Sequence, residues 1–163
     1  MRSEPIYIVM GVSGSGKTTL ARSLAHATGG DWLDADTFHS SANKARMAQG
    51  IPLTDNDRRP WLDRLNAVLR EASSQGKRLF LACSALKQKY RDRLVSGLPR
   101  ARFVYLKGTL EQVRARLAER THAFMPASLV ESQFADLEEP KDAIVLDISR
   151  PVDEMVEDFC RLA

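Results

Sequence analysis

The sequence has little of what disulfide-bonded, zinc-binding or membrane-spanning proteins depend on. Its 163 residues include only two cysteines, Cys83 and Cys160, too few for a disulfide framework or a zinc site. Both lie among apolar neighbours, so we expect two buried free thiols. No window reaches 18 apolar residues, and the first residues lack a signal-peptide pattern. We therefore expect a cytoplasmic protein that does not act at a membrane.

Blocks of like charge are also absent. Lysine and arginine total 24 against 21 acidic residues, a net charge of +3, and the two signs are interleaved. Although the isoelectric point is near 9.0, this dispersal does not favour nucleic-acid binding. Seventeen of the 24 basic residues are arginines, whose guanidinium groups suit phosphate and carboxylate. The composition therefore favours a small anionic substrate.

The order of apolar segments predicts an α/β fold. Four apolar runs and a weaker fifth one are typical of buried parallel strands: 6–10, 79–83, 103–106, 143–146 and, weaker, 32–34. Helical spacing is clearest over 57–72, with Asp57 as a plausible N-cap, and over 110–117, which would begin at Gly108 or Thr109. The alternation predicts a three-layer fold in which helices flank a five-stranded parallel sheet.

Two stretches do not follow this alternation. Residues 37–57 follow the weak strand, and residues 121–128 follow the helix that carries Arg116 and Arg120. In α/β domains such insertions form binding lobes or lids, and ligands bind beyond the carboxyl ends of the strands. Within one domain of residues 1–163 we expect an acceptor-binding insertion over 37–57 and a lid over 116–128.

A complete phosphate-loop motif, Gly-x-x-x-x-Gly-Lys-[Ser/Thr], follows the first strand. Its residues are Gly11, Val12, Ser13, Gly14, Ser15, Gly16, Lys17 and Thr18. Glycines let the backbone amides wrap a phosphate, and the following helix adds the positive end of its dipole. Lys17 would reach the β- and γ-phosphates, and the Thr18 hydroxyl would hold Mg²⁺. The guanine-reading motif Asn-Lys-x-Asp is incomplete at Asn43-Lys44, so ATP is the expected nucleotide.

Phosphoryl transfer also needs a carboxylate near the metal and a group that positions the attacking hydroxyl. The candidates are Asp34 and Asp36, which lie at the end of the weak strand. One of them would act on Mg²⁺ through water while the other accepts the hydroxyl proton. The alternative is that both simply cap the following helix, with Asp36 as its N-cap.

Further polar residues are candidates for recognising the acceptor. They are His39, Asn43, Lys44, Arg58, Lys87, Tyr90 and Arg91. Lys87 and Arg91 are four residues apart, so one helical face could present both. Arg116 and Arg120 have the same spacing. They would either carry positive charge to the transferring phosphate or belong to an exposed amphipathic helix.

These segments resemble the bacterial gluconokinase family, small P-loop kinases related in fold to shikimate and nucleoside monophosphate kinases. The resemblance covers nearly the whole chain. Its segments are the phosphate loop, Asp34-x-Asp36-x-x-His39, Pro52 to Leu62, Cys83 to Asp92, Tyr105 to Gly108 and Ser132-Gln133-Phe134. The phosphate loop alone would not separate kinase families, whereas the segments at Pro52 and Cys83 are much more specific.

The resemblance implies ATP- and Mg²⁺-dependent phosphorylation of the terminal hydroxyl of D-gluconate, giving 6-phospho-D-gluconate. It places Asp36 at the acceptor hydroxyl, and Thr18 and Asp34 near Mg²⁺. Arg116 and Arg120 would join the phosphate loop in binding ATP, and Lys17, Asp36 and Arg120 would be catalytic. The residues expected to bind the substrate are Asp36, His39, Arg58, Lys87 and Arg91. Family members are commonly homodimers.

The chain departs from the family pattern after the lid arginines. The family usually has Gly-His-Phe there, whereas this chain reads Thr121-His122-Ala123-Phe124. The usual histidine position therefore holds Ala123, and His122 is displaced by one residue. On a helix that displacement would rotate the side chain by about 100°. His122 accordingly receives no catalytic role by analogy.

Other functions stay open from the sequence alone. Within the kinases, the alternative is a shikimate-like or other sugar-acid kinase. A non-catalytic nucleotide-binding module is disfavoured because Lys17, Thr18 and the Asp34/Asp36 pair are all present. A nucleic-acid motor is disfavoured because 163 residues leave no room for a separate nucleic-acid-binding domain.

Overall fold

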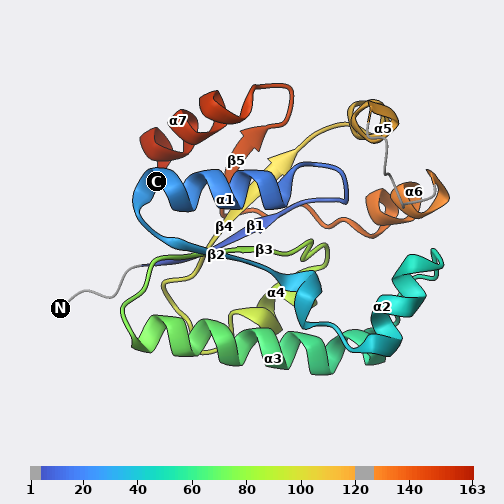
Figure 1. Ribbon diagram of the computed structural model, residues 1–163, viewed down its shortest axis with the longest axis horizontal. Coiled ribbons are helices and arrows are strands. Elements are labelled where there is room, and N and C mark those ends of the chain that lie inside the picture. Colours follow the sequence, from blue (N-terminus) through green and yellow to red (C-terminus); the bar gives the residue numbers. More distant parts are fainter. Residues whose placement is uncertain (1–4, 120–126) are drawn as a thin grey trace.

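The computed structural model describes residues 5–119 and 127–163, which form a helix-flanked parallel sheet (Figure 1). In chain order the elements are β1 (Ile6–Met10), α1 (Lys17–Thr28), β2 (Asp31–Asp34), the 3₁₀ helix η1 (Ala35–Phe38), α2 (Ser41–Ala48), α3 (Asp55–Ser74), β3 (Leu79–Ala82), α4 (Gln88–Leu94), β4 (Arg102–Lys107), α5 (Leu110–Glu119), α6 (Ala127–Asp136), β5 (Ala143–Asp147) and α7 (Val152–Leu162). The five strands have the order β2-β3-β1-β4-β5, and every pairing is parallel. The predicted α/β class and five-stranded sheet are confirmed.

The central strand β1 shows why both faces of the sheet need helices. All five of its residues are buried, and they alternate between two hydrophobic clusters. Tyr7 and Val9 pack on the side of α1 and α7, whereas Ile6, Ile8 and Met10 pack on the side of α3. A continuous apolar run is therefore required, because neither face of this strand meets water. Figure 1 shows the two helix layers above and below the sheet.

The weak strand predicted at 32–34 exists as β2 and pairs with β3 at the edge of the sheet. Its residues are half-buried or exposed, which explains the weak apolar signal. The position of β2 in the sheet determines which loops meet, because β2 ends at Asp34 on the same edge as the carboxyl ends of β3 and β1. The loops that leave these three strands can therefore form one site.

Two local predictions were wrong. Helix α3 begins after Thr54, not after Asp57. The Thr54 hydroxyl accepts from the Asp57 amide at 3.1 Å, and the Asp57 carboxylate accepts from the Thr54 amide at 2.9 Å. This capping box places Asp57 inside the first turn. The second error concerns Cys160, which is exposed on α7, whereas Cys83 is buried as expected.

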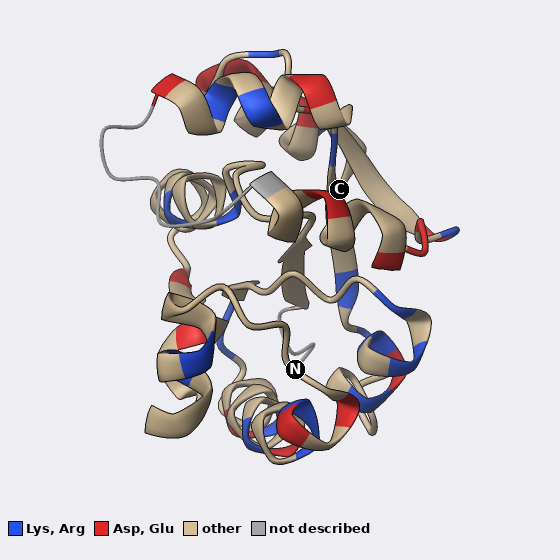
Figure 2. Ribbon diagram, turned by 90° about the vertical axis from the view of Figure 1, so that its right-hand side faces the viewer, with Lys and Arg blue, Asp and Glu red and all other residues tan. Residues whose placement is uncertain are grey.

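The helix predicted to begin at Gly108 or Thr109 begins after Thr109. The Thr109 hydroxyl accepts from the Gln112 amide at 3.1 Å, and Gln112 Oε1 accepts from the Thr109 amide at 2.8 Å. Charges of both signs are scattered along the helices in Figure 2, as the interleaved sequence indicates. In the described ranges no helix is both long and apolar enough to cross a membrane.

Candidate active site

The phosphate loop forms the turn between β1 and α1. Gly14 and Gly16 have φ angles of +84° and +95°, a region that other residues rarely adopt. A Cβ on Gly14 would also lie 3.0 Å from the Leu117 side chain, so α5 packs directly over the loop. Inside the turn, Val12 O accepts from Ser15 Oγ at 2.7 Å and from Lys17 Nζ at 3.0 Å. These bonds preorganise the loop for a phosphate.

A cavity of about 580 Å³ extends from this loop across the carboxyl ends of β2 and β3. Its walls come from the phosphate loop, the Asp34–Asp36 turn, the insertion over 37–57, the first turns of α3, and helices α5 and α6. This volume is in the range that small-molecule sites occupy in proteins. The predicted insertion over 37–57 folds into the end of η1, α2 and the loop to α3, and it forms the side of the cavity away from α5.

Asp34 joins the phosphate loop to the carboxylate turn. Its Oδ2 accepts from the Thr18 hydroxyl at 3.3 Å, and its Oδ1 accepts from the Asp36 amide at 2.9 Å. The capping role weighed from the sequence therefore holds for Asp34, which is the N-cap of η1, and not for Asp36. Because Asp34 supplies the cap, the Asp36 carboxylate is left to line the cavity.

Asp36 is open to the cavity, but its carboxyl group does not behave as in free solution. The surrounding protein removes water from the charged form and raises the pKa of Asp36. The neighbouring Asp34 carboxylate raises it further, whereas Lys17 on the phosphate loop opposes the shift. A carboxylate with a raised pKa is a better proton acceptor, as a general base requires.

His39 lines the cavity and is held there as a neutral ring. It is buried, and it stacks on Trp61, whose indole nitrogen donates to Ala35 O at 2.7 Å. Loss of hydration, together with the positive charges of Arg58 and Lys44, lowers the pKa of His39 to about 4. Asn43 Nδ2 lies 3.4 Å from His39 Nδ1, so the network assigns the ring proton to Nε2.

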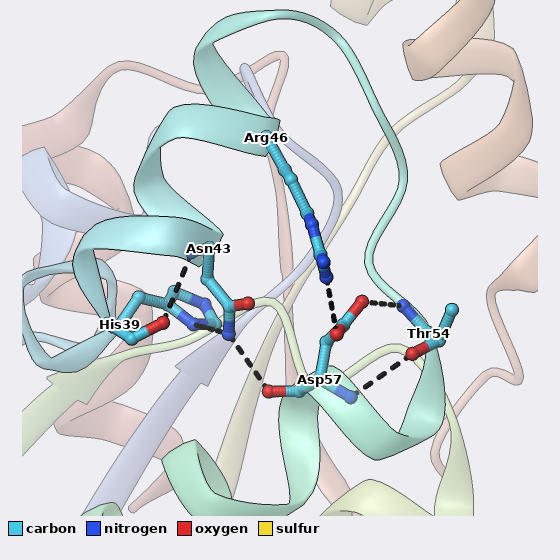
Figure 3. A network of polar contacts seen from close by, with 6 residues as sticks. His39, Asn43, Arg46, Thr54 and Asp57 are labelled. Carbon is cyan, nitrogen blue, oxygen red and sulfur yellow. Dashed lines mark hydrogen bonds and ion pairs between the residues drawn. The ribbon is translucent and has the colours of Figure 1, made fainter.

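The same network fixes the insertion to α3, as Figure 3 shows. Asn43 Nδ2 donates to Asp57 O at 2.9 Å, and Arg46 pairs with the Asp57 carboxylate at 2.5 Å. Asp57 thus binds α2 with its carbonyl and carboxylate, and the same carboxylate completes the capping box of α3 with Thr54. His39 is in this way positioned by two helices rather than by its own loop alone.

Arg58 and Lys17 are the two side chains with permanent positive charge among the described residues that line the cavity. Lys17 belongs to the phosphate end. Arg58 lies on the first turns of α3, and its NH1 donates to the Tyr90 hydroxyl at 2.8 Å. Arg58 is thus a lining residue of the cavity, and its contact with an acceptor stays a prediction.

The structure does not bring Lys87 and Arg91 into this cavity. Lys87 is the N-cap of α4 and lies near the Tyr90 ring. Arg91 is 1% exposed, and its guanidinium donates to Ala85 O, Leu86 O, Gln88 Oε1 and Glu138 O. Arg91 therefore ties the loop after β3 to the segment after α6. Spacing alone could not give this correction, because one of the acceptors, Glu138 O, lies 47 residues along the chain.

The lid arginines are described only in part. Arg116 lies on α5, donates to Ile148 O, and would be 3.2 Å from a Cβ on Gly16, so its guanidinium lies beside the phosphate loop. Arg120, His122 and Ala123 lie outside the described residues. Of the lid predicted over 116–128, the structure describes the last turn of α5 and the first residues of α6.

Gln133 on α6 is a site residue to which the sequence analysis gave no role. Its Oε1 accepts from the Ser13 amide at 2.7 Å, and its Nε2 donates to Ser13 Oγ at 3.0 Å. The helix after the lid is thereby bonded to the phosphate loop. The available signal was the Ser132-Gln133-Phe134 segment, which the resemblance had included without a function.

The comparisons with known proteins agree with this arrangement. A family model described as an AAA domain matches residues 6–140. The chain is 40% identical over 161 residues to the thermosensitive gluconokinase of Escherichia coli K12, covering 96% of this chain and 86% of that protein. It is 41% identical over 157 residues to a probable gluconokinase of Mus musculus, with 86% and 85% of the two chains covered.

Solved structures give the same result. A sugar kinase from Janibacter sp. HTCC2649 superposes with a TM-score of 0.90 at 45% identity, covering 97% of this chain and 93% of that one. A gluconokinase from Sinorhizobium meliloti 1021 superposes with a TM-score of 0.86 at 37% identity, covering 100% and 95%. An APS kinase of Mycobacterium tuberculosis, at 17% identity and a TM-score of 0.72 over 99% and 98% of the two chains, shares the fold.

Proposed function

The chain belongs to the gluconokinase family, and from this premise we propose that it transfers the γ-phosphoryl group of ATP to the terminal hydroxyl of D-gluconate, giving 6-phospho-D-gluconate. One observation carries the proposal. The phosphate loop lines the same cavity as Asp36, the neutral His39 ring and Arg58. Gluconate combines one carboxylate with a row of hydroxyls, so one guanidinium with a carboxylate and an imidazole suits it.

At the nucleotide end, the loop amides and Lys17 would hold the β- and γ-phosphates, and Arg116 would add positive charge from α5. Mg²⁺ suits the donors present, since the Thr18 hydroxyl and the Asp34 carboxylate are oxygen ligands that already lie 3.3 Å apart. The ion would neutralise charge on the phosphates. The described residues hold no group of three or more histidine, cysteine or acidic side chains for a metal, so nucleotide and water oxygens would supply the other ligands.

At the acceptor end, Asp36 would accept the proton of the attacking hydroxyl as it approaches the γ-phosphorus. The influence of Lys17 on the pKa of Asp36 supports a position of Asp36 between the nucleotide and the acceptor. His39 would donate from Nε2 to a hydroxyl of the acceptor, and its low pKa of about 4 keeps it neutral. Arg58 would hold the carboxylate at the far end of the acceptor.

The test is an ADP-release assay with Mg-ATP and a panel of acceptors: gluconate, related sugar acids, shikimate and nucleoside monophosphates. We expect strong stimulation by gluconate and weak stimulation by the rest. Stimulation by shikimate or a nucleotide, with none by gluconate, would overturn the assignment. If no acceptor raises ADP release, the alternative of a non-catalytic nucleotide-binding module is supported instead.

Two further expectations belong with this proposal. An ATP-consuming sugar-acid kinase is expected to work in the cytoplasm, where ATP is produced. The family resemblance also predicts a homodimer, and light scattering on the purified chain would measure its mass in solution against the 18.2 kDa of one chain.

A further inference from the structure

Among the described residues, Tyr90 on α4 is the one side chain with which the Arg58 side chain forms a hydrogen bond. Arg58 NH1 donates to the Tyr90 hydroxyl at 2.8 Å, and the guanidinium carbon lies 5.1 Å from the centre of the Tyr90 ring. Tyr90 itself is buried, at 7% exposure. Tyr90, a buried residue of another helix, therefore holds the guanidinium end of the long Arg58 side chain.

The direction of the Tyr90 hydroxyl is set by a third residue. That hydroxyl donates to Asp55 Oδ1 at 2.5 Å, and Lys89 pairs with the other carboxylate oxygen at 2.5 Å. The hydrogen bonds from Lys89 and Tyr90 lower the pKa of Asp55 to about 2, so Asp55 stays a pure acceptor near neutral pH. The hydroxyl hydrogen consequently points to Asp55, and a lone pair of the oxygen faces Arg58.

This arrangement matters because Arg58 is the cation at the acceptor end of the cavity. An arginine that is free to rotate loses conformational entropy when it binds a carboxylate, and one that is already held loses less. Asp55 and Arg58 lie on the first turns of α3, whereas Tyr90 lies on α4, so the contact also fixes the two helices relative to each other.

Resting on the function proposed above, we propose that Tyr90 is a positioning residue for the acceptor carboxylate: its hydroxyl, oriented by Asp55, holds the Arg58 guanidinium in the direction in which it binds gluconate. Tyr90 does not touch the reacting atoms. It acts on gluconate affinity through Arg58 and leaves phosphoryl transfer and ATP binding unchanged.

Tyr90→Phe is the direct test, because it keeps the ring and its packing and removes only the hydroxyl. We expect the KM for gluconate to rise about tenfold, the scale of one lost hydrogen bond to a charged group. The kcat and the KM for ATP should each stay within about twofold. Tyr105→Phe is the matched control. It removes the hydroxyl of another buried tyrosine, bonded to Glu139 at 3.3 Å, and should leave the KM for gluconate unchanged.

A double-mutant cycle separates positioning from a merely structural role. In an Arg58→Met background, Tyr90→Phe should have no further effect on kcat/KM for gluconate, because the group that Tyr90 positions is gone. Full additivity of the two substitutions would overturn the proposal, and so would an equal fall of kcat/KM for gluconate and for ATP in Tyr90→Phe. Asp55→Asn is an independent variant, because it removes the carboxylate that orients the Tyr90 hydroxyl and leaves Tyr90 itself unchanged. It should raise the KM for gluconate in the same way, by a smaller factor.

Wild-type behaviour distinguishes this inference from the proposed function. If gluconate does not stimulate wild-type ADP release, the proposed function fails. If it does, and Tyr90→Phe leaves the KM for gluconate unchanged, only the positioning role fails.

Discussion

His39 and Trp61 stack face to face, with ring centres 4.0 Å apart and ring planes 14° apart. The stack ties the insertion over 37–57 to α3, and both rings line the cavity. The Trp61 indole also donates to Ala35 O, so it is hydrogen-bonded to the turn that carries Asp36. Trp61 therefore contacts both His39 and the turn that carries Asp36, the two residues proposed to act on the acceptor.

The low pKa of His39 predicts a pH-dependent stability. Between pH 6.5 and about 4 the unfolded chain takes up a proton at His39 and the folded chain does not, so folding stability falls as the pH is lowered through this range. The shift from 6.5 to about 4 corresponds to at most about 3 kcal/mol. Urea unfolding of wild type and His39→Gln at pH 4.5, 5.5 and 7 measures it. The advantage of wild type should shrink toward acid, and a difference independent of pH would contradict the assignment.

Asp36→Asn should abolish turnover while leaving ATP binding nearly unchanged. The amide cannot accept the hydroxyl proton, so we expect kcat to fall by about 10²–10⁴-fold, the usual contribution of a general base. Calorimetric titration with ATP would measure binding separately. Asp31→Asn, on the exposed opposite end of β2, is the matched control and should keep normal activity. A near-normal kcat in Asp36→Asn would exclude Asp36 as the base.

Arg91→Met should lower stability rather than gluconate affinity. It leaves three backbone carbonyls of a buried site without their donor, which costs about 2–4 kcal/mol. Arg93→Met is a matched control on the same helix, since among the described residues the Arg93 side chain pairs with the exposed Asp63 carboxylate and its loss should change stability little. Urea denaturation of the two variants compares them. A raised KM for gluconate at unchanged stability would return Arg91 to the acceptor site.

For Arg120→Ala we predict a larger loss in kcat than in gluconate affinity. An arginine on the nucleotide side of a phosphoryl-transfer site stabilises charge that develops in the transition state, so it affects turnover first. Steady-state kinetics with gluconate varied at saturating ATP separates the two parameters. The reverse pattern, a raised KM with normal kcat, would instead place Arg120 at the acceptor.

Much of the fold could be read from local patterns. The four strong apolar runs became β1, β3, β4 and β5 within a residue or two, because strands that are covered on both faces must be apolar throughout. The cap of α3 was misplaced because Thr54, Asp55 and Asp57 are all good capping residues. The choice among them was made by the reciprocal Thr54–Asp57 bonds, which depend on backbone geometry.

The sequence by itself determined the nucleotide half of this protein, because the phosphate loop is one contiguous segment. Its glycine conformations and the bond from Lys17 to Val12 O all lie within that segment. The acceptor half was decided by tertiary structure. Arg58 and Arg91 were equal candidates along the chain, and the packing of α4 turned one toward Tyr90 and the cavity, and the other into a cluster of carbonyls that includes Glu138. A guanidinium group donates to the oxygen atoms that lie within about 3 Å of it, and the folded chain determines which oxygen atoms those are.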